Sequence, residues 1–565
     1  MYFDFTVEIP ESKGKITRKK IKDVTYINYE YDRIYKPEKQ YTIPKRTTIG
    51  RRCEEDIEKM YPNANYLKYF PDKELPDKKD RSKRSCCLRI GSYLMIQKII
   101  KDYELDTMLK RILGKNEDLF LDLVTYSIIA ENNAAQYYPD YAYNHPLFTS
   151  DMHIYSDSKV SDFLSEITIN QSVGFLNEWN ASRNHREQIY ISYDSTNMTC
   201  QAGDIDLAEF GHSKTGDDKP IINHAIAYDR TNREPLFCED YPGSIVDISQ
   251  LQYMLERAKG YGYRKVGFIL DRGYFSKENI HFMDKNNYEF VIMVKGMKKI
   301  VQPLIRQHLG EFEEDRKTSI RKYKVNGITI KDFLYPSDEK ERYFHIYYST
   351  KKHLMERELL ENKIDQMART LKKMEGKPVT IAKSFEKYFD LIYHHPGQED
   401  ERFTVAREKT DIVSDEMRMC GYFCIITSKK MSAKDALELY KSRDNSEKLF
   451  SAEKSFLGNR GLRVQSDESA ETKLFIAFVA LIIRSKIYTS LKDAEEESET
   501  KHNFMTVPAA LKELEKIEMT RHLDNCYRLD HAVTKTQKTI LKAFGIDANY
   551  IKRKSEEIGA VLAES

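Results

Sequence analysis

Four polar side chains share one stripe of a helix that the sequence predicts to begin after Ser432 and to run to residue 454. At about 100° per residue the stripe is about 60° wide, and it contains Tyr440, Arg443, Glu447 and Lys454. A carboxylate can ligate a cation, and a guanidinium or ammonium beside it can bind phosphate. A buried ion-pair cluster would produce the same pattern, so the stripe alone does not decide between these roles.

Two further carboxylates follow apolar, β-like runs upstream. The segment 186–194 (REQIYISYD) predicts a strand ending at Asp194, and 265–271 (KVGFILD) predicts one ending at Asp271. Ligands of open α/β sheets bind where strands run out into loops. With Glu447 the aspartates make an all-oxygen set, which hard divalent cations such as Mg²⁺ prefer. Two such ions about 3.5–4 Å apart support in-line displacement at phosphorus.

The elements around the aspartates occur in an informative order. Strands are predicted at 220–229, 235–241 and 288–295, and amphipathic helices at 247–262 and 276–287. With the two aspartate strands this gives the order βββαβαβ, which indicates three antiparallel strands followed by parallel crossovers. The predicted class is therefore α/β, with a ribonuclease-H-like mixed five-stranded sheet as its core.

Composition limits the classes of protein. The chain has 565 residues, of which 32% are charged and 40% hydrophobic. We find no apolar run of the about 18–20 residues that a membrane span needs, so a soluble, cytoplasmic protein is expected. Because the net charge is only +2, contacts with nucleic acid must come from local basic clusters. Eight cysteines without a CxxC pair predict reduced thiols rather than a zinc site.

Changes in pattern divide the chain into six predicted regions. They are an N-terminal β-rich basic region with a linker (1–84), a helical domain that could bind DNA (85–185), the first part of the catalytic core (186–295), a β-rich insertion domain (296–420), the second part of the core with the glutamate helix (421–490) and a helical C-terminal region (491–565). In the first region, phosphate contact and a solvated sheet face explain equally well the basic residues Lys45, Arg46, Arg51 and Arg52.

The stripe also resembles a known signature. Tyr, two residues, Arg, three residues, Glu, six residues and Lys mark a subgroup of bacterial insertion-sequence transposases of the cut-and-paste DDE type, and the sequence matches at every spacing. The aspartates are 271 − 194 = 77 residues apart, and the glutamate follows after 447 − 271 = 176, which leaves room for the β-rich insertion of such enzymes. The resemblance covers about residues 90–490. Segments similar to the family are YDSTN, GHSKTGDDKP, EDYPGSIVD and DRGYFS.

The resemblance implies a role for each of these residues. Asp194, Asp271 and Glu447 would ligate two Mg²⁺ or Mn²⁺ ions. Phosphates near the cleaved transposon end would be contacted by Tyr440, Arg443 and Lys454. The implied reaction is metal-dependent cleavage at transposon ends, followed by attack of the 3′-hydroxyl on target DNA.

The resemblance also implies partners and a location. The partners would be double-stranded DNA, as terminal inverted repeats and as target, and a second copy of the chain in a homodimer. The expected location is the bacterial cytoplasm, at the nucleoid, without a membrane. The alternatives are a non-catalytic DNA-binding regulator derived from a transposase and a stand-alone nuclease of the same fold.

Three further residues have two interpretations each. Arg272 could contact phosphate or balance the acidic cluster. His212 and Lys214, between the first two predicted strands of the core, could face DNA or solvent.

Overall fold

The protein is described by a computed structural model. The described residues are 2–3, 5–22, 24–37, 40–54, 56–73, 84–183, 188–200, 202, 205–211, 218–245, 247–294, 300–397, 401–443, 461–498, 502–522 and 525–564. The chain forms two compact units, one of Met1–Phe175 with Glu453–Ser565 and the other of Leu176–Ala452.

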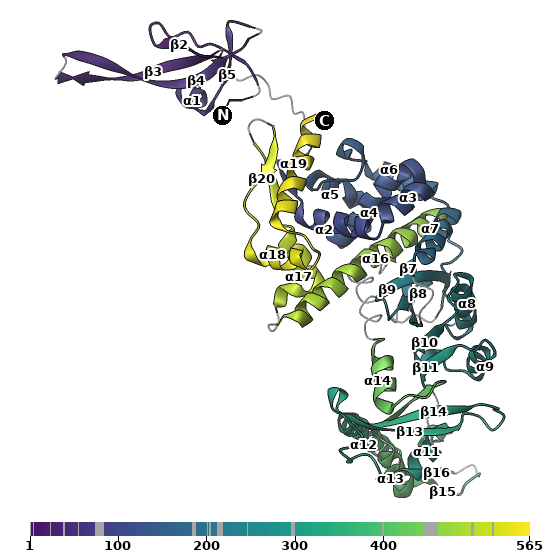
Figure 1. The fold of residues 1–565 in the computed structure, drawn as a ribbon. Coiled ribbons are helices and arrows are strands. Elements are labelled where there is room, and N and C mark those ends of the chain that lie inside the picture. The colour runs from purple at the N-terminus through teal and green to yellow at the C-terminus, as the bar shows by residue number, and fades with distance from the viewer. Residues whose placement is uncertain are drawn as a thin grey trace. The chain divides into compact units, whose positions relative to one another are not determined.

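A mixed sheet is the centre of the second unit (Figure 1). Five of its strands are β7 (Ile189–Cys200), β8 (Ile221–Asp229), β9 (Glu234–Pro242), β10 (Val266–Leu270) and β11 (Glu289–Met293). The first three pair antiparallel, and β10 pairs parallel with both β7 and β11. The spatial order is β9-β8-β7-β10-β11, and the sequence of three antiparallel strands followed by parallel crossovers is the predicted one.

The helices of this part begin and end near the predicted positions. Helix α8 (Asp247–Gly260) connects β9 to β10, and α9 (Lys277–Lys285), capped by Ser276, connects β10 to β11. Every residue of β10 is buried. Since both faces of a parallel strand are covered, such a strand is a continuous apolar run rather than an alternating one.

The sheet is larger than the five strands predicted. Strand β17 (Tyr422–Thr427) pairs antiparallel with β11, and β14 (Glu341–Tyr348) pairs with β17. Beyond β14 lie β13 (Val325–Phe333) and β12 (Ser319–Ile320). The last three strands belong to the predicted insertion, so part of the insertion continues the mixed sheet instead of forming a sheet of its own.

The rest of the insertion has a separate small core. Helices α11 (Gln302–Gln307), α12 (Thr350–Lys372) and α13 (Thr410–Arg418) accompany the hairpin of β15 (Phe389–His394) and β16 (Arg402–Glu408). The buried side chains of α12 and α13 pack with those of the hairpin.

An antiparallel sheet forms the N-terminal part of the first unit. Its order is β1-β5-β4-β3-β2, and the strands are β1 (Val7–Glu8), β2 (Ile16–Ile21), β3 (Val24–Lys36), β4 (Tyr41–Arg52) and β5 (Lys59–Pro62). The short helix α1 (Ala64–Tyr69), capped by Asn63, covers one face. Outside that core most side chains of β2 and β3 are exposed or half-exposed.

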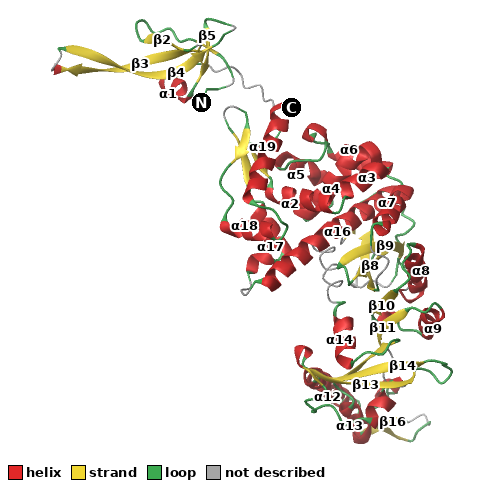
Figure 2. Cartoon of the chain, viewed as in Figure 1, coloured by secondary structure: helices red, strands yellow, loops and turns green. Residues whose placement is uncertain are grey.

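Helices dominate the remainder of the first unit (Figure 2). They are α2 (Gly91–Asp102), α3 (Leu105–Leu113), α4 (Glu117–Ile129), α5 (Tyr138–Asn144), α6 (Asp157–Glu166), α16 (Asp467–Glu497), α17 (Val507–Leu514), α18 (Lys535–Lys542) and α19 (Ala548–Glu564), with α7 (Ile169–Ala181) leading into the second unit. The C-terminal region is not purely helical as predicted. Strand β19 (Glu518–Arg521) pairs on one side with β20 (Tyr527–Leu529) and on the other with β6 (Cys87–Arg89), a partner too distant in sequence to be foreseen.

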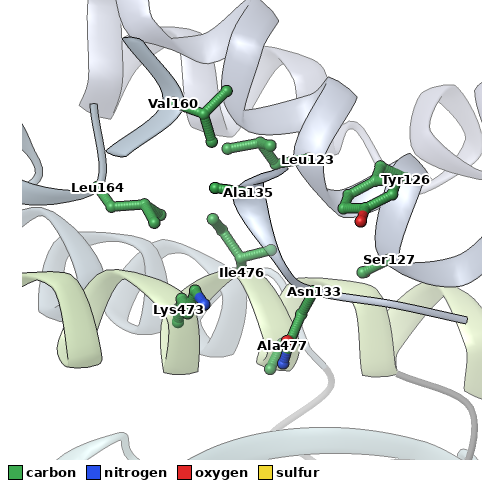
Figure 3. Close-up of a pocket in the computed structure, with 10 residues that line it drawn as sticks. All are labelled: Leu123, Tyr126, Ser127, Asn133, Ala135, Val160, Leu164, Lys473, Ile476 and Ala477. Carbon is green, nitrogen blue, oxygen red and sulfur yellow. The ribbon is translucent and has the colours of Figure 1, made fainter. Parts of the chain in front are cut away.

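Helix α16 corrects the expectation that no segment is apolar enough to span a membrane. Among the described helices, it is the one that is long and apolar enough to cross a membrane, by length and composition only. Of its apolar window, 83% is buried inside the protein. That burial is typical of a core helix. A cavity of about 20 Å³ lies between α4, α6 and α16, and Figure 3 shows residues that line it. It has room for about one water molecule.

Candidate active site

The register of two parallel strands brings Asp194 and Asp271 together. Leu270, the last residue of β10, pairs with Tyr193 of β7. The next residue on each strand is an aspartate, so the two carboxylates occupy neighbouring positions and the same face of the sheet. Neighbouring strands lie about 4.8 Å apart, a spacing at which two carboxylates can share a ligand.

Strand β7 does not end at Asp194 as predicted. It continues to Cys200, because Ser195 to Thr199 pair with β8. Asp194 nevertheless lies beside the end of a strand, because the neighbouring β10 ends at Leu270, the residue paired with Tyr193. The opening beside Asp194 is therefore made by the shorter strand, which the local sequence of β7 could not reveal.

Three groups hold the carboxylate of Asp271. The backbone N–H of Arg272 donates to its Oδ1 at 2.7 Å, and the hydroxyl of Tyr440 donates to the same oxygen at 3.3 Å. Arg443 Nη1 lies 3.1 Å from that oxygen. The side chain of Asp271 remains 37% exposed, so it is fixed in direction and still open to a ligand.

Helix α14 (Ala433–Lys441) positions Tyr440 and Arg443. Ser432 caps its N-terminus by accepting the N–H of Asp435, as predicted. Leu437 and Tyr440 are buried against the sheet, in one cluster with Ile269 of β10. Ile269 precedes Asp271 by two residues and so shares its face of the sheet. The buried face of α14 thus sets the two polar groups over the end of β10.

The prediction of one continuous helix from Tyr440 to residue 454 is wrong at its start. Helix α14 ends at Lys441. The hydroxyl of Ser442 donates to the carbonyl of Leu439, and the N–H of Arg443 bonds to Tyr440 at 3.1 Å in place of Leu439. Such bonds tighten and end a helix. Glu447 and Lys454 lie outside the described residues.

Arg443 contacts an acid in the structure without DNA. We expected it to bind phosphate rather than neutralise an acid, whereas here it forms an ion pair with Asp271. Its guanidinium stands 5.5 Å from the centre of the Tyr440 ring. The contact with phosphate stays a prediction for both residues.

The arrangement fits a hard divalent cation in part. Two adjacent carboxylates supply oxygen ligands only, and the opening at the end of β10 leaves space for water or phosphate oxygens. Among the described residues no group of three or more His, Cys, Asp or Glu side chains gathers as a metal site. A third carboxylate would therefore have to come from outside them, where the predicted Glu447 lies.

The other predicted contacts have varied surroundings. The side chain of Arg272 is exposed, and His212 and Lys214 lie outside the described residues. Lys45 Nζ is 3.4 Å from Asp32 Oδ2, and Arg46 Nη2 is 3.2 Å from Glu30 Oε2.

The last two predicted contacts lie further along β4. Arg51 stands 5.3 Å from the centre of the Tyr61 ring, and Arg52 is half-exposed. None of these basic side chains in β4 belongs to the second unit, which holds both aspartates.

Sequence reasoning missed a polar network that begins on β7, three residues beyond the first aspartate. Asn197 Nδ2 donates to Asn223 Oδ1 at 2.6 Å, and Asn223 Nδ2 donates to the carbonyls of Pro242 and Ile245, each at 3.0 Å. The network ties β7 and β8 to the segment before α8. Because asparagine is depleted in strands, two asparagines inside strand runs were a signal that could have been used.

A buried carboxylate on the opposite face was also missed. Glu239 accepts a hydrogen bond from the hydroxyl of Tyr193 at 3.1 Å, and Arg257 Nη1 lies 3.7 Å from it. Burial raises the pKa of Glu239. Since Tyr193 directly precedes Asp194, this cluster restrains the strand that presents the first aspartate.

Comparison with known proteins places this geometry in a family. Residues 186–483, more than half of the chain, match the model of the transposase DDE domain. The chain belongs to the DDE transposase family. Both aspartates and α14 lie within the matched residues, and so does the predicted glutamate.

Other comparisons are less close. A solved structure of the piggyBac transposase in a synaptic complex with hairpin DNA aligns at 8% identity and a TM-score of 0.31 over 72% of this chain and 65% of that one. This chain therefore spans less than two thirds of that protein's length. No curated protein matches in sequence.

Proposed function

We propose that the chain is an active DNA transposase of a bacterial insertion sequence. It would cut DNA at the ends of its element and join the released 3′-hydroxyl to target DNA. The observation that carries this proposal is the in-register placement of Asp194 and Asp271 beside the shorter strand β10. Membership of the DDE transposase family supports it independently.

The predicted site residues would hold and orient the scissile phosphate. Asp194 and Asp271, with Glu447, would hold two Mg²⁺ or Mn²⁺ ions, which supply an activated nucleophile and stabilise the leaving oxygen. Arg443 would exchange its ion pair with Asp271 for a phosphate oxygen when the ions neutralise the carboxylate, since guanidinium binds both anions in the same fork geometry. Tyr440 would keep Asp271 aligned through its hydroxyl.

Substitution of the carboxylates tests this proposal. The full chain is incubated with Mg²⁺ and a duplex carrying the end of the DNA element that encodes it, and nicked and joined strands are counted. Asp194→Asn, Asp271→Asn and Glu447→Gln are each expected to abolish cleavage, because each removes a proposed metal ligand, while binding of the duplex persists. Undiminished cleavage by one of these variants would remove that residue from the site.

A matched control comes from the insertion. Asp390 of β15 is a strand aspartate whose side chain is 67% exposed, and it lies outside the cluster that α14 forms with the sheet. Asp390→Asn is expected to cut at the wild-type rate. A large loss in this control would mean that the assay reports general damage to the fold.

The same assay separates the alternatives. A regulator would bind the duplex without cutting it, and a stand-alone nuclease would give cut ends without joined transposon–target product. We further propose that the enzyme acts as a homodimer on two ends, in the bacterial cytoplasm at the nucleoid. Sedimentation with and without the end duplex tests the dimer.

A further inference from the structure

The N-terminal sheet carries a two-stranded ribbon that extends past its other strands (Figure 1). Strand β2 pairs with β3 only as far as Tyr29, and β5 pairs with β4 only from Gly50. From Glu30 to Lys36 and from Tyr41 to Arg46 the strands β3 and β4 pair with each other alone. We call these residues the ribbon. The six intervals between its seven residues, at about 3.4 Å each, make it roughly 20 Å long.

The ribbon exposes apolar side chains on both faces. Ile34 is 44%, Tyr35 is 58% and Tyr41 is 49% exposed. The pairing of Ile34 with Ile43 and of Lys36 with Tyr41 puts Ile34 and Tyr41 on one face, and it puts Tyr35 on the other. A two-stranded hairpin without a covered face is only marginally stable in water. A partner that surrounds the ribbon on both sides would therefore bury these side chains.

Positive charge at the base of the ribbon indicates what that partner is. Residues 12–22, which contain the edge strand β2, have six basic residues and no acidic one. All six are exposed, and in the described part of the chain none lies in an ion pair: Lys13, Lys15, Arg18, Lys19, Lys20 and Lys22. Within the ribbon, by contrast, Arg46 and Lys45 have carboxylate partners.

We propose that the ribbon enters the major groove of duplex DNA while the basic residues of β2 contact the flanking phosphates. The major groove is about 12 Å wide and admits a two-stranded β-ribbon. Apolar and hydroxyl-bearing side chains on both faces then meet base edges, including the methyl group of thymine. The inference rests on the proposed function, because it makes this duplex the end of the transposon.

The simplest other explanation is that the lysines of β2 only protect an edge strand. Charged edge strands prevent pairing with other chains, and exposed side chains on a hairpin can be merely solvated. That explanation predicts that neither β2 nor the ribbon affects DNA binding.

The test measures binding without divalent ions, so that it does not depend on whether the chain cuts DNA. Fluorescence anisotropy of a labelled element-end duplex and of a scrambled duplex of equal length is followed with the full chain at several salt concentrations. The triple variant Ile34→Ser/Tyr35→Ser/Tyr41→Ser is expected to lose about tenfold of its preference for the element end, with an unchanged salt dependence.

The β2 variant is expected to behave differently. Arg18→Gln/Lys19→Gln/Lys20→Gln should weaken binding of both duplexes alike. The slope of log affinity against log salt should fall by about 3, because each phosphate contact contributes about 0.9. Different losses from the two variants would separate base contact by the ribbon from phosphate contact by β2.

A control with three apolar side chains of greater overall exposure comes from α12. Leu354, Met355 and Leu359 are 62%, 56% and 68% exposed, and their replacement by serine should change neither affinity nor preference. The ribbon proposal is overturned if the ribbon variant binds both duplexes as the wild type does, or if single-stranded DNA competes as well as duplex. If the wild-type chain cuts element ends and the ribbon variant binds as the wild type does, the ribbon proposal is wrong and the proposed function still holds.

Discussion

The mixed sheet that carries the proposed active site, which we call the catalytic sheet, and the N-terminal sheet differ in how their strands are covered. Every residue of β8 and β10 is buried, whereas the last six residues of β3 are exposed. The buried strands place two aspartates in one register with little freedom to move. The exposed strands offer side chains to a partner. Rigid burial therefore suits the part of the chain that positions carboxylates, and exposure suits the part that we assign to recognition.

The same substitution in the two sheets should test the difference in burial with the largest effect. Ile269 of β10 is fully buried and Ile34 of β3 is 44% exposed. We expect Ile269→Ala to cost about 2–5 kcal/mol of unfolding free energy, because it leaves a cavity. Ile34→Ala should stay within about 0.5 kcal/mol. Urea unfolding of each variant measures both values, and equal costs would contradict the contrast in burial.

Between pH 7 and pH 5, acid should destabilise the catalytic sheet more than the N-terminal sheet. Burial lowers the pKa of His345 in β14 to about 4, and its ring nitrogens lie 2.9 Å from Thr329 Oγ1 and from Thr427 Oγ1. An unfolded histidine titrates near 6.5 and binds more protons, so stability falls as pH drops from about 6.5 to 4, by about 3 kcal/mol in full. Residues 1–73 contain no histidine.

Hydrogen exchange of β13, β14 and β17 against that of β3 and β4, at pH 7 and pH 5, measures this difference. In His345→Gln the amide replaces the ring and does not titrate, so the extra acid sensitivity of the catalytic sheet should disappear. Equal acid sensitivity in the variant and the wild type would assign the effect to other groups.

Gly267 tests the tight packing of the catalytic sheet at a single position. A Cβ there would lie 2.4 Å from the ring of Tyr190 on β7. At Gly14, in the N-terminal region, a Cβ meets no atom within 4 Å, and the strain would come from its φ of +74° alone. We expect Gly267→Ala to cost about 1–3 kcal/mol through overpacking and to lower cleavage by shifting β10 against β7. Thermal melting and the cleavage assay measure the two effects, and cleavage at the wild-type rate would show that the register tolerates the shift.

The smallest effect is expected from one hydroxyl. Tyr440→Phe removes the 3.3 Å hydrogen bond to Asp271 and should lower cleavage roughly fivefold, because a hydrogen bond contributes about 1 kcal/mol. Tyr253→Phe on α8, at a residue that is 66% exposed, is the control and should cut normally. A loss as large as that from Asp271→Asn would mean that Tyr440 contacts the substrate itself.

The sequence predicts much of the site because its signals are local. Apolar runs locate β10 and β11, Ser432 marks the start of α14, and the order of elements implies that the two aspartate strands are neighbours. Register follows from none of these signals. It depends on pairing between residues more than seventy positions apart, such as Tyr193 with Leu270.

Other features were not predictable because they arise from competition between distant partners. Strand β7 runs past Asp194 because β8 continues to offer hydrogen bonds there. Strands β12 to β14 join the catalytic sheet because β17 has a second edge to pair. The helix ends at Lys441 because the hydroxyl of Ser442 bonds to a carbonyl within the last turn, a choice that helical periodicity does not encode.

Helix α14 connects the insertion to the carboxylates. At its start the hydroxyl of Tyr347 on β14 donates to the carbonyl of Ala433 at 2.7 Å, and near its end Tyr440 reaches Asp271. A short helix fixed at both ends transmits displacement rather than absorbing it. If β14 slid along its neighbours by a fraction of an ångström, the phenol and the guanidinium would shift over the second aspartate. Grafting a foreign insertion onto this sheet would therefore alter the geometry of the chemistry, even with every carboxylate left in place.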